Sequence, residues 1–476
     1  MNHKTENNTS YRNTDQIKAQ HVVVIGSGSG AFACAIKAAE NGAKVTIIEG
    51  ANVIGGCCVN EGCVPSKILI QQQRRNPFTG LENHAPSLSR SLLAQQQTTR
   101  AKELRTAKYQ HILDTNTALT LVKGWATFKD SKTLIVTNNV GEKQKIHADK
   151  ILIATGSTPT IPSILGLSKT PYWTSTEALF SEELPIHLIV IGSSVIALEI
   201  AQAYRRLGSK VTVLARHTLL YREEPLLGEK LNECFEKEGI RVLNHTQTTK
   251  VSHDGKYFIL ETNNGIIRGD RLLISTGRHA NTSYLNLSEI GVETEKNGEI
   301  IVNERMETNI SGIYAAGDSS NIPQFVYVAA AAGSRAGINM TGGDAKLDLT
   351  NIPTVIFTAP QVATVGLNEA QANELGIETD SRVLEMENVP RALANFETDG
   401  FIKLVVEKVT GRLIGAQILA YEGGEMIQSV SLAIKNHMTV DNLADQLFPY
   451  LTMVEGLKLC AQTFKKDVKD LSCCAG

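Results

Sequence analysis

Residues 22–31 read Val-Val-Val-Ile-Gly-Ser-Gly-Ser-Gly-Ala, an apolar strand that runs directly into a glycine turn. An alanine-rich helical pattern continues to about residue 41, and a second apolar run at 44–48 ends at Glu49. Strand, glycine turn, helix and strand in this order are typical of a dinucleotide-binding unit. The stretch therefore predicts an α/β fold with a parallel sheet, although an ordinary α/β turn would share these features.

Four residues of this first unit are candidates for holding a dinucleotide. Gly26 permits the tight turn, and Gly28 lets backbone N–H groups approach a pyrophosphate at the helix N-terminus. Ala31 completes the G-x-G-x-x-A pattern. Glu49 can accept hydrogen bonds from both hydroxyls of an adenosine ribose. We expect this unit to bind the adenosine part of a cofactor.

A pair of cysteines follows immediately, because residues 55–67 read Gly-Gly-Cys-Cys-Val-Asn-Glu-Gly-Cys-Val-Pro-Ser-Lys. In an ideal helix, Cys58 and Cys63 would lie about 7.5 Å apart and point in different directions. A disulfide between them needs a distorted first helical turn, which Gly62 and Pro65 allow. The pair is predicted to be redox-active, although two buried structural thiols would show the same spacing.

A second copy of the dinucleotide-binding unit begins near residue 187. An apolar strand at 188–191 leads to Gly192, and Ser194 and Ala197 follow in a turn and a helical pattern. Another strand pattern comes after this helix, as in the first unit. The repeat predicts two dinucleotide sites in one chain.

The second unit lacks the acid that ends the second strand of the first unit. That acid comes 23 residues after the first glycine of its unit, and the same count from Gly192 reaches Ala215. Arg216 follows at once, and Arg222 lies nearby. Guanidinium groups pair bidentately with phosphate, so this exchange favours a ribose with a 2′-phosphate. The second unit is predicted to bind NADPH, with solvated surface arginines as the alternative.

Two further strand ends carry residues that suit a cofactor site. One strand leads to Thr155 and Gly156, and another leads to Gly317 and Asp318. Asp318 could accept a hydrogen bond from a polyol or ribose hydroxyl, although Gly317-Asp318 could also be only a turn. Residues 347–476 alternate strand and helix patterns, which predicts an α+β interface domain.

Length, charge and composition exclude several kinds of function. A chain of 476 residues is too long for one core. A net charge of −2 offers no basic surface to nucleic acid. No apolar run is long enough to span a bilayer, and residues 1–20 are predicted to be a disordered arm rather than a signal peptide. Eight cysteines without an export signal favour catalysis or metal binding in the cytoplasm.

The two dinucleotide units, the C-x₄-C pair, the strand-end motifs and the α+β tail together resemble the flavin-dependent pyridine nucleotide–disulfide oxidoreductases. The resemblance covers nearly the whole chain from residue 21. It implies a glutathione-reductase-like fold with FAD in the first unit, NADPH in the second and a homodimer. The implied divisions are an arm at 1–20, an FAD domain at 21–160 and 281–346, an NADPH domain at 161–280 and a dimerisation domain at 347–476.

Within this family, the chain is most similar to the branch that reduces Hg(II) to Hg(0). The similarity rests on Phe-Pro-Tyr-Leu-Thr-Met-Val-Glu-Gly at residues 448–456 and Leu-Ser-Cys-Cys-Ala-Gly at residues 471–476. Disulfide-reducing relatives carry a His-x-x-x-x-Glu pair here, whereas this chain has Tyr450 at the histidine position and keeps Glu455. Reducing a disulfide requires a base for a thiol proton, but reducing a metal ion requires thiolates and no proton donor.

The resemblance also implies a role for each cysteine in the site. Cys63 resembles the thiolate that contacts the flavin, and Cys58 resembles the exchanging thiol. Cys473 and Cys474, contributed by the other subunit, would take Hg(II) from small thiols and pass it to this pair. Hg(II) is a soft ion that suits thiolates, and adjacent cysteines are too close for an ordinary disulfide. A tail that ends in cysteines by accident is the alternative.

Other side chains gain roles from the same resemblance. Lys67 resembles the lysine beside the flavin ring, paired with Glu199. Tyr450 and, by a looser match, Tyr109 resemble two tyrosines that line the metal pocket. Tyr109 could equally lie on a helix surface.

Several features depart from the family pattern. Cys57 stands where threonine is usual and Glu61 where an apolar residue is usual, so a third thiol and a new charge border the redox pair. The segment at residues 71–77 is about two helical turns shorter than the corresponding segment that we expect in this family. The N-terminal metal-binding domain of many relatives is expected to be absent. The remaining cysteines, predicted to be core or surface thiols, are Cys34, Cys234 and Cys460.

Two other functions stay open from the sequence. A reductase of low-molecular-weight disulfides shares every cofactor motif but leaves Tyr450 and the cysteine tail unexplained. A catalytically impaired flavoprotein that sequesters metal is compatible with Cys57 and with the short segment. The sequence therefore predicts an NADPH- and FAD-dependent enzyme that reduces Hg(II), with these two functions as alternatives.

Overall fold

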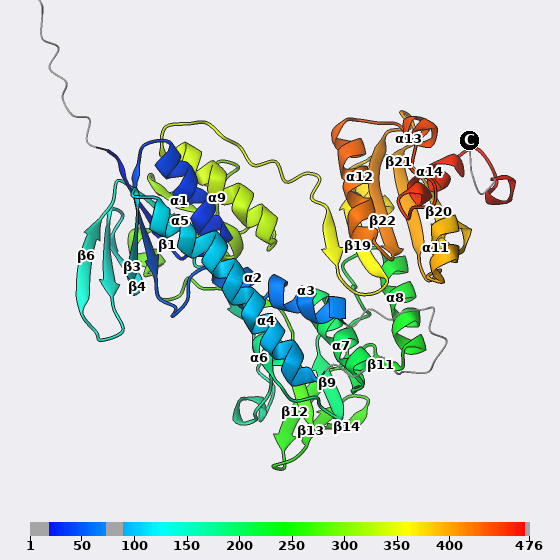
Figure 1. Cartoon of the computed structure of the whole chain (residues 1–476), viewed down its shortest axis with the longest axis horizontal. Helices are drawn as coiled ribbons and strands as arrows, with labels where there is room; N and C mark the ends of the chain where they lie inside the picture. The colour runs from blue at the N-terminus through cyan, green and yellow to red at the C-terminus, as the bar shows by residue number, and fades with distance from the viewer. Residues whose placement is uncertain (1–18, 73–88, 472–476) are drawn as a thin grey trace, which may run out of the picture. The chain divides into compact units, whose positions relative to one another are not determined.

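The computed structural model describes residues 19–72 and 89–471, which form two compact units (Figure 1). Each unit draws on three separate segments of the chain. As far as they are described, the first comprises Met1–Ile54, Gln110–Gly156 and Ala280–Leu347, and the second Gly55–Tyr109, Ser157–His279 and Asp348–Gly476. The predicted arm at 1–20 and the short segment at 71–77 lie largely outside the described residues.

The first unit is built on a five-stranded parallel sheet with the strand order β17-β7-β1-β2-β3. Its central strand is fully apolar inside, since Val22, Val23 and Val24 have no exposed surface. Such continuous apolar runs are expected where both faces of a parallel sheet are covered. The strands are β1 (His21–Ile25), β2 (Lys44–Glu49), β3 (Leu119–Lys123), β7 (Lys150–Ile153) and β17 (Ile313–Ala315).

Two helices and an antiparallel ribbon cover this sheet. Helices α1 (Ser29–Glu40) and α9 (Val326–Met340) lie side by side in Figure 1, and a Cβ on Gly333 would lie 2.0 Å from the Gly30 carbonyl oxygen. Their backbones therefore touch. The ribbon shares an apolar core with β1 and consists of β4 (Trp125–Asp130), β5 (Thr133–Thr137) and β6 (Lys143–His147).

The second unit contains another parallel sheet, with the order β11-β10-β9-β15, and so confirms the predicted repeat. Its strands are β9 (His187–Ile191), β10 (Lys210–Leu214), β11 (Ile240–Leu243) and β15 (Arg271–Ile274). Helices and small sheets surround it: α6 (Ser175–Phe180), α7 (Val195–Leu207), α8 (Pro225–Lys237), β12 (Thr248–His253), β13 (Phe258–Thr262), β14 (Gly265–Gly269), β8 (Ser157–Pro159) and β16 (Arg278–Ala280).

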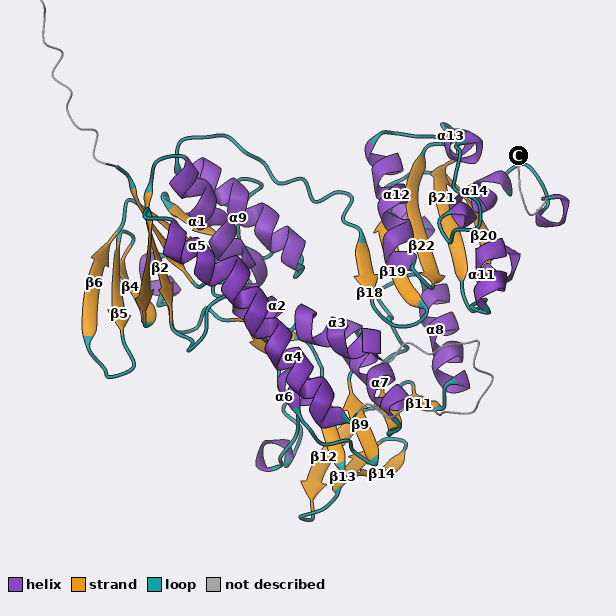
Figure 2. Ribbon diagram, viewed as in Figure 1, coloured by secondary structure: helices purple, strands orange, loops and turns teal. Residues whose placement is uncertain are grey.

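The C-terminal part is the expected α+β domain, an antiparallel sheet in the order β18-β19-β22-β21-β20 with helices packed on it (Figure 2). The strands are β18 (Thr354–Ile356), β19 (Gln361–Gly366), β20 (Thr379–Glu385), β21 (Phe401–Glu407) and β22 (Leu413–Ala420). The helices are α10 (Glu369–Glu374), α11 (Pro390–Asn395), α12 (Gly423–Lys435), α13 (Val440–Asp445) and α14 (Glu455–Gln462).

Short helices carry the cysteine stretch. Cys58 lies in α2 (Gly56–Asn60) and Cys63 begins α3 (Cys63–Gln72). The expectation of one helix with a distorted first turn was therefore wrong, because Glu61 and Gly62 separate two helices. The polar helical pattern that follows is divided into α4 (Arg90–Arg105), a π-helix (Thr106–Gln110) and α5 (His111–Thr115). No helix in residues 19–72 and 89–471 is long and apolar enough to cross a membrane.

Candidate active site

The first glycine turn has the geometry of a phosphate-binding loop. Gly26 has a φ of +106°, and a Cβ there would lie 2.3 Å from the Ala154 carbonyl oxygen, so only glycine fits. Gly28 is the N-cap of α1, so no side chain covers the start of this helix at that position. Ala31 is fully buried beneath it. The turn thus presents backbone donors and helix dipole to an anion.

Glu49 ends β2 beside this turn. Its carboxylate accepts hydrogen bonds from the Ser27 hydroxyl and from the backbone N–H of Ala51 at 2.7 Å. These bonds fix the carboxylate at the edge of the sheet where the glycine turn begins. The position is the one expected for a ribose-binding acid.

The two other strand-end motifs belong to the same edge. β7 pairs with both β1 and β17, so Thr155 and Gly156 after β7 lie near Gly317 and Asp318 after β17. The Ala316 N–H donates to the Ile153 carbonyl at 3.0 Å, which ties these strand ends together.

One buried hydroxyl group at this edge of the sheet could hydrogen-bond to a bound ligand. Among the described residues, Thr155 Oγ1 is buried and has no hydrogen-bond partner. Such atoms are rare in folded proteins unless a ligand or water satisfies them. With the glycine cradle and Glu49, it makes this edge compatible with a bound FAD. Asn281, which the sequence did not single out, donates to the Thr155 carbonyl at 3.1 Å and holds the loop.

The second glycine turn repeats the first in the other unit. Gly192 has a φ of +131°, and a Cβ there would lie 2.0 Å from the Ser275 carbonyl oxygen. Ser194 is the N-cap of α7, and Ala197 is fully buried in its first turn. The turn again leaves the helix N-terminus open to a phosphate.

Two arginines follow β10 on the exposed surface, and their binding to a 2′-phosphate stays a prediction. Ala215 is buried where the first unit has its acid, and Arg216 and Arg222 are exposed. The Arg222 Nε donates to the Tyr221 hydroxyl at 2.9 Å, and its guanidinium lies 5.3 Å from the Tyr221 ring centroid. The segment thus holds positive charge and a supporting aromatic ring where a 2′-phosphate would be recognised.

The two redox cysteines touch each other as thiols. Cys58 donates a hydrogen bond to Cys63, and this bond is the main reason that the pKa of Cys63 falls to about 7. Burial opposes the shift, and the nearby Lys67 ammonium supports it. The same bond, together with burial, raises the pKa of Cys58. With a pKa of about 7, Cys63 is a thiolate in roughly half of the molecules at neutral pH, while Cys58 keeps its proton.

Lys67 is held beside the pair by a buried acid. Its Nζ lies 2.8 Å from Glu199 Oε2, and the Glu199 side chain is only 5% exposed. Glu199 also accepts the backbone N–H of Phe357 at 2.9 Å, while the Lys67 Nζ lies 4.3 Å from the Phe357 ring centroid. The structure confirms the predicted pairing of Lys67 with Glu199 and adds Phe357, which no local pattern could have indicated.

Cys57 lies next to the pair and contacts an arginine. The Arg278 Nη2 donates to Cys57 Sγ at 3.9 Å, and the same guanidinium donates to the Ser157 hydroxyl and carbonyl at 2.8 and 2.7 Å. A Cβ on Gly62 would lie 3.3 Å from Cys57 Sγ, so the third thiol lies over the break between α2 and α3. Glu61 is exposed.

The remaining candidates lie at several places in the second unit. Tyr109 lies in the π-helix, and its ring is 3.4 Å from where a Cβ on Gly55 would be, which places it near the start of α2. Tyr450 is 55% exposed. Glu455 begins α14, is 6% exposed and accepts the Leu451 N–H at 3.3 Å. Cys473 and Cys474 lie outside the described residues.

The three other cysteines are buried thiols. Burial raises the pKa of each to about 12, so none forms a thiolate at neutral pH. Their burial agrees with the prediction that they are core or surface thiols. They are Cys34, Cys234 and Cys460.

Comparison with known proteins identifies the family of this chain from matches over most of its length. The family model described as pyridine nucleotide-disulphide oxidoreductase matches residues 20–333, and its dimerisation domain matches residues 352–461. Among solved structures, the flavoprotein disulfide reductase RclA from Escherichia coli superposes with a TM-score of 0.86 at 28% identity, over 94% of this chain and 100% of RclA. LpdA from Mycobacterium tuberculosis superposes with a TM-score of 0.84 at 26% identity, with the same coverage.

Mercuric reductases of several bacteria are similar to this chain over nearly its whole length. That of Shewanella putrefaciens is 77% identical over 98% of this chain and 85% of its own length. That of Shigella flexneri is 57% identical over 96% of this chain and 83% of its own length. The chain therefore belongs to the pyridine nucleotide-disulphide oxidoreductase family and, within it, to the mercuric reductases.

Proposed function

We propose that this chain is a flavoenzyme that uses NADPH to reduce Hg(II) to Hg(0), and so detoxifies mercury, through Cys58 and Cys63. The observation that carries the proposal is the 77% identity to a mercuric reductase over 98% of the chain. The two free thiols of the pair also suit such a reaction, because the lowered pKa of Cys63 favours its thiolate, the form that binds a soft metal ion.

Each cofactor is assigned to one of the glycine turns. FAD is held by the turn at Gly26 and Gly28, by Glu49 and by the strand ends that carry Thr155 and Asp318, in a domain of residues 21–160 and 281–346. A flavin bound there supplies two-electron transfer between NADPH and the cysteine pair. NADPH is held in residues 161–280, with its 2′-phosphate on Arg216 and Arg222.

The cysteine pair binds the metal and prepares it for reduction. Hg(II) forms bonds with both sulfur atoms, and the proton of Cys58 is released as its Hg–S bond forms. Lys67, fixed by Glu199, stabilises the negative charge on Cys63 before the metal arrives. Two electrons that originate in the hydride of NADPH then reduce Hg(II) to Hg(0), both Hg–S bonds break, and the two sulfurs remain as thiolate and thiol once a proton returns to Cys58.

Delivery of the metal is assigned to the other subunit of a homodimer. The dimerisation domain at residues 352–461 supports such an assembly. Cys473 and Cys474 of one subunit would take Hg(II) from small thiols and transfer it to the pair of the other, past Tyr450. Tyrosine at this position leaves Glu455 without the histidine base that a disulfide reductase would use. We assign the enzyme to the cytoplasm, because that compartment keeps thiols such as Cys63 reduced.

A substrate comparison tests this function. The purified full-length protein should oxidise NADPH rapidly with Hg(II) in excess small thiol and only slowly with glutathione disulfide or lipoamide. The Cys58→Ser and Cys63→Ser variants should retain bound flavin but lose the Hg(II)-dependent oxidation. Rapid oxidation with a disulfide and none with Hg(II) would assign the chain to the disulfide reductases, and a protein without bound flavin would favour metal sequestration.

A further inference from the structure

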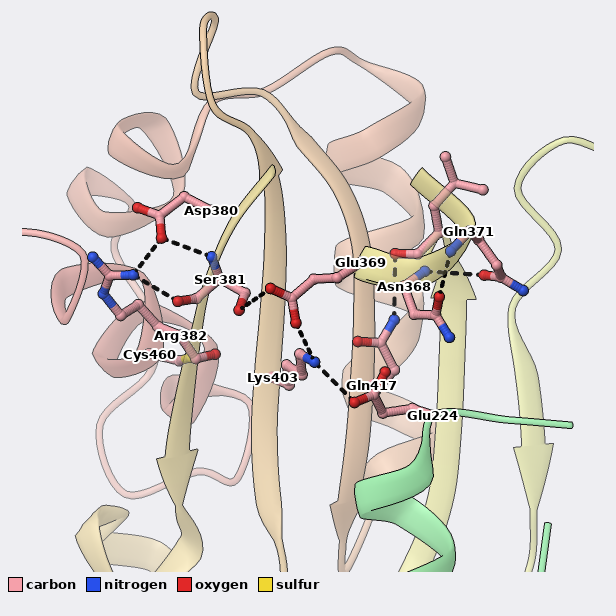
Figure 3. Close-up of polar contacts among 11 residues, drawn as sticks. Glu224, Asn368, Glu369, Gln371, Asp380, Ser381, Arg382, Lys403, Gln417 and Cys460 are labelled. Atoms are coloured by element: carbon pink, nitrogen blue, oxygen red, sulfur yellow. Dashed lines mark hydrogen bonds and ion pairs between the residues drawn. The ribbon is translucent and has the colours of Figure 1, made fainter. Parts of the chain in front are cut away.

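A buried lysine of the C-terminal sheet holds an acid of the coenzyme unit. Lys403 lies in β21, and its side chain is only 8% exposed. Its Nζ lies 2.9 Å from Glu224 Oε1 and 2.6 Å from Glu369 Oε2 (Figure 3). Glu369 is further held by the Ser381 hydroxyl at 2.9 Å. A charge this deep is tolerated only when it is paired, so the three side chains are fixed as a group.

Glu224 links this group to the start of helix α8. It is the N-cap residue of α8, but its side chain makes no capping bond. Instead, the carboxylate is directed to Lys403, and the Glu224 side chain is 13% exposed. Figure 3 shows Glu224 entering from α8 and Lys403 from the sheet. The pair therefore joins the beginning of α8 to β21.

The segment just before Glu224 carries the arginines assigned to NADPH. Arg222 precedes Glu224 by two residues, and the turn between them and β10 is anchored by the buried Leu219 and Leu220. A Cβ on Gly228 of α8 would lie 2.2 Å from the Leu219 carbonyl oxygen, so the helix packs directly on this turn. Any shift of the start of α8 would move the turn and its arginines.

The negative charge of Glu224 also bears on coenzyme binding. A carboxylate two residues from Arg222 would repel a coenzyme phosphate and compete for the guanidinium. Lys403 pairs with this carboxylate and offsets its charge, while both arginines remain exposed. Glu369, on the other side of Lys403, belongs to α10 and is remote in sequence from the coenzyme segment.

We propose that Lys403 is a positioning residue for NADPH: by pairing with Glu224 it neutralises that acid and fixes the start of α8, so that Arg216 and Arg222 can hold the 2′-phosphate. The proposal rests on the proposed function, which assigns NADPH to this unit. In this proposal, a residue of the C-terminal domain, outside the dinucleotide-binding fold, contributes to the selectivity for NADPH over NADH.

The test compares coenzymes in the flavin-loaded, full-length enzyme with Hg(II) as acceptor. In Lys403→Met the KM for NADPH should rise about tenfold, while the KM for NADH stays within about twofold and kcat with saturating NADPH is unchanged. Lys403→Arg should restore most of the NADPH affinity. Glu369→Gln, which removes the other acid from the same lysine, is the matched control and should leave the ratio of the two KM values unchanged.

A second variant tests the pairing without removing the lysine. Glu224→Gln breaks the ion pair that fixes the start of α8. Because Lys403 already offsets the charge of Glu224, the variant relieves little repulsion, so the KM for NADPH should rise about threefold and that for NADH should stay unchanged. This measurement decides the matter even if Lys403→Met does not fold. Equal changes for both coenzymes in Lys403→Met, or no change in selectivity in Glu224→Gln, would overturn the role of Lys403. A wild-type enzyme that uses NADH as well as NADPH would instead overturn the coenzyme assignment itself.

Discussion

The thiol of Cys58 donates a hydrogen bond to Cys63 across the break between two short helices, and so divides the charge of the pair unequally. The pKa of Cys63 falls to about 7, and that of Cys58 rises. A soft metal ion therefore meets one sulfur that ionises near neutral pH, next to a second sulfur that loses its proton only when the metal replaces it.

This division predicts the pH dependence of thiol labelling. The reactive thiolate of Cys63 should become populated as the pH rises through about 7, so its alkylation by iodoacetamide should increase over that range. Cys58 should react more slowly at the same pH. Mass spectrometry of the reduced native enzyme measures both rates. The buried Cys34 and Cys460 serve as internal controls and should remain unmodified, and faster labelling of Cys58 than of Cys63 would contradict the assignment.

Removing the cation beside the pair should raise the pKa of Cys63. In Lys67→Met the Coulombic support of the thiolate is lost, so the alkylation profile of Cys63 should move to higher pH and the rate at pH 7 should fall about threefold to tenfold. Lys67→Arg keeps the charge and should restore most of the rate. An unchanged profile in Lys67→Met would show that the hydrogen bond from Cys58 alone sets the pKa.

Substitutions in the two glycine turns should affect different cofactors. A Cβ at Gly26 or at Gly192 would meet a carbonyl oxygen at 2.3 or 2.0 Å, and both residues have positive φ, so alanine should cost about 1–3 kcal/mol at either site. Gly26→Ala should be purified with much less flavin. Gly192→Ala should keep its flavin and show a raised KM for NADPH. Flavin absorbance and steady-state kinetics distinguish them, and loss of flavin from Gly192→Ala would reverse the assignment.

The shared active site predicts complementation between two inactive variants. Cys58→Ser lacks the reducing pair, and the double variant Cys473→Ser with Cys474→Ser lacks the delivery pair, so each homodimer should turn over thiol-bound Hg(II) at least tenfold more slowly than wild type. A mixed dimer combines one intact pair of each kind at one of its two sites. Activity should therefore reappear after the two variants are dissociated and reassembled together. No recovery in verified mixed dimers would place both pairs in one subunit.

Local pattern was enough to predict both parallel sheets, because a glycine turn between a strand and a helix is specified by neighbouring residues. The count from Gly192 to Ala215 also led to Arg216 and Arg222, whose side chains are exposed, but their binding to NADPH stays a prediction. The geometry of the cysteine pair was less predictable, since the break at Gly62 depends on how α2 and α3 pack. Phe357 beside Lys67, and Lys403 beside Glu224, were beyond reach of the sequence. Phe357 is 158 residues from Glu199, to which its N–H donates, and Lys403 is 179 residues from Glu224, so only tertiary packing brings these residues together.

Cys57, which stands where threonine is usual in the family, contacts an arginine in the structure. Cys57 lies against Arg278, a guanidinium that is itself fixed by Ser157, so the third thiol has a defined environment rather than a loose one. The contacts of Cys57 do not explain a role for this thiol in the reaction. The sequence could not indicate this neighbour, because Arg278 lies 221 residues further along the chain.

The most direct test of the account is the stoichiometry of the metal product. Purified enzyme given NADPH and Hg(II) with excess small thiol should release volatile Hg(0), with one NADPH consumed for each Hg(0), because the hydride carries two electrons. Cys58→Ser should release none under the same conditions. Consumption of NADPH without release of Hg(0) would contradict the claim that the cysteine pair delivers its electrons to a metal ion.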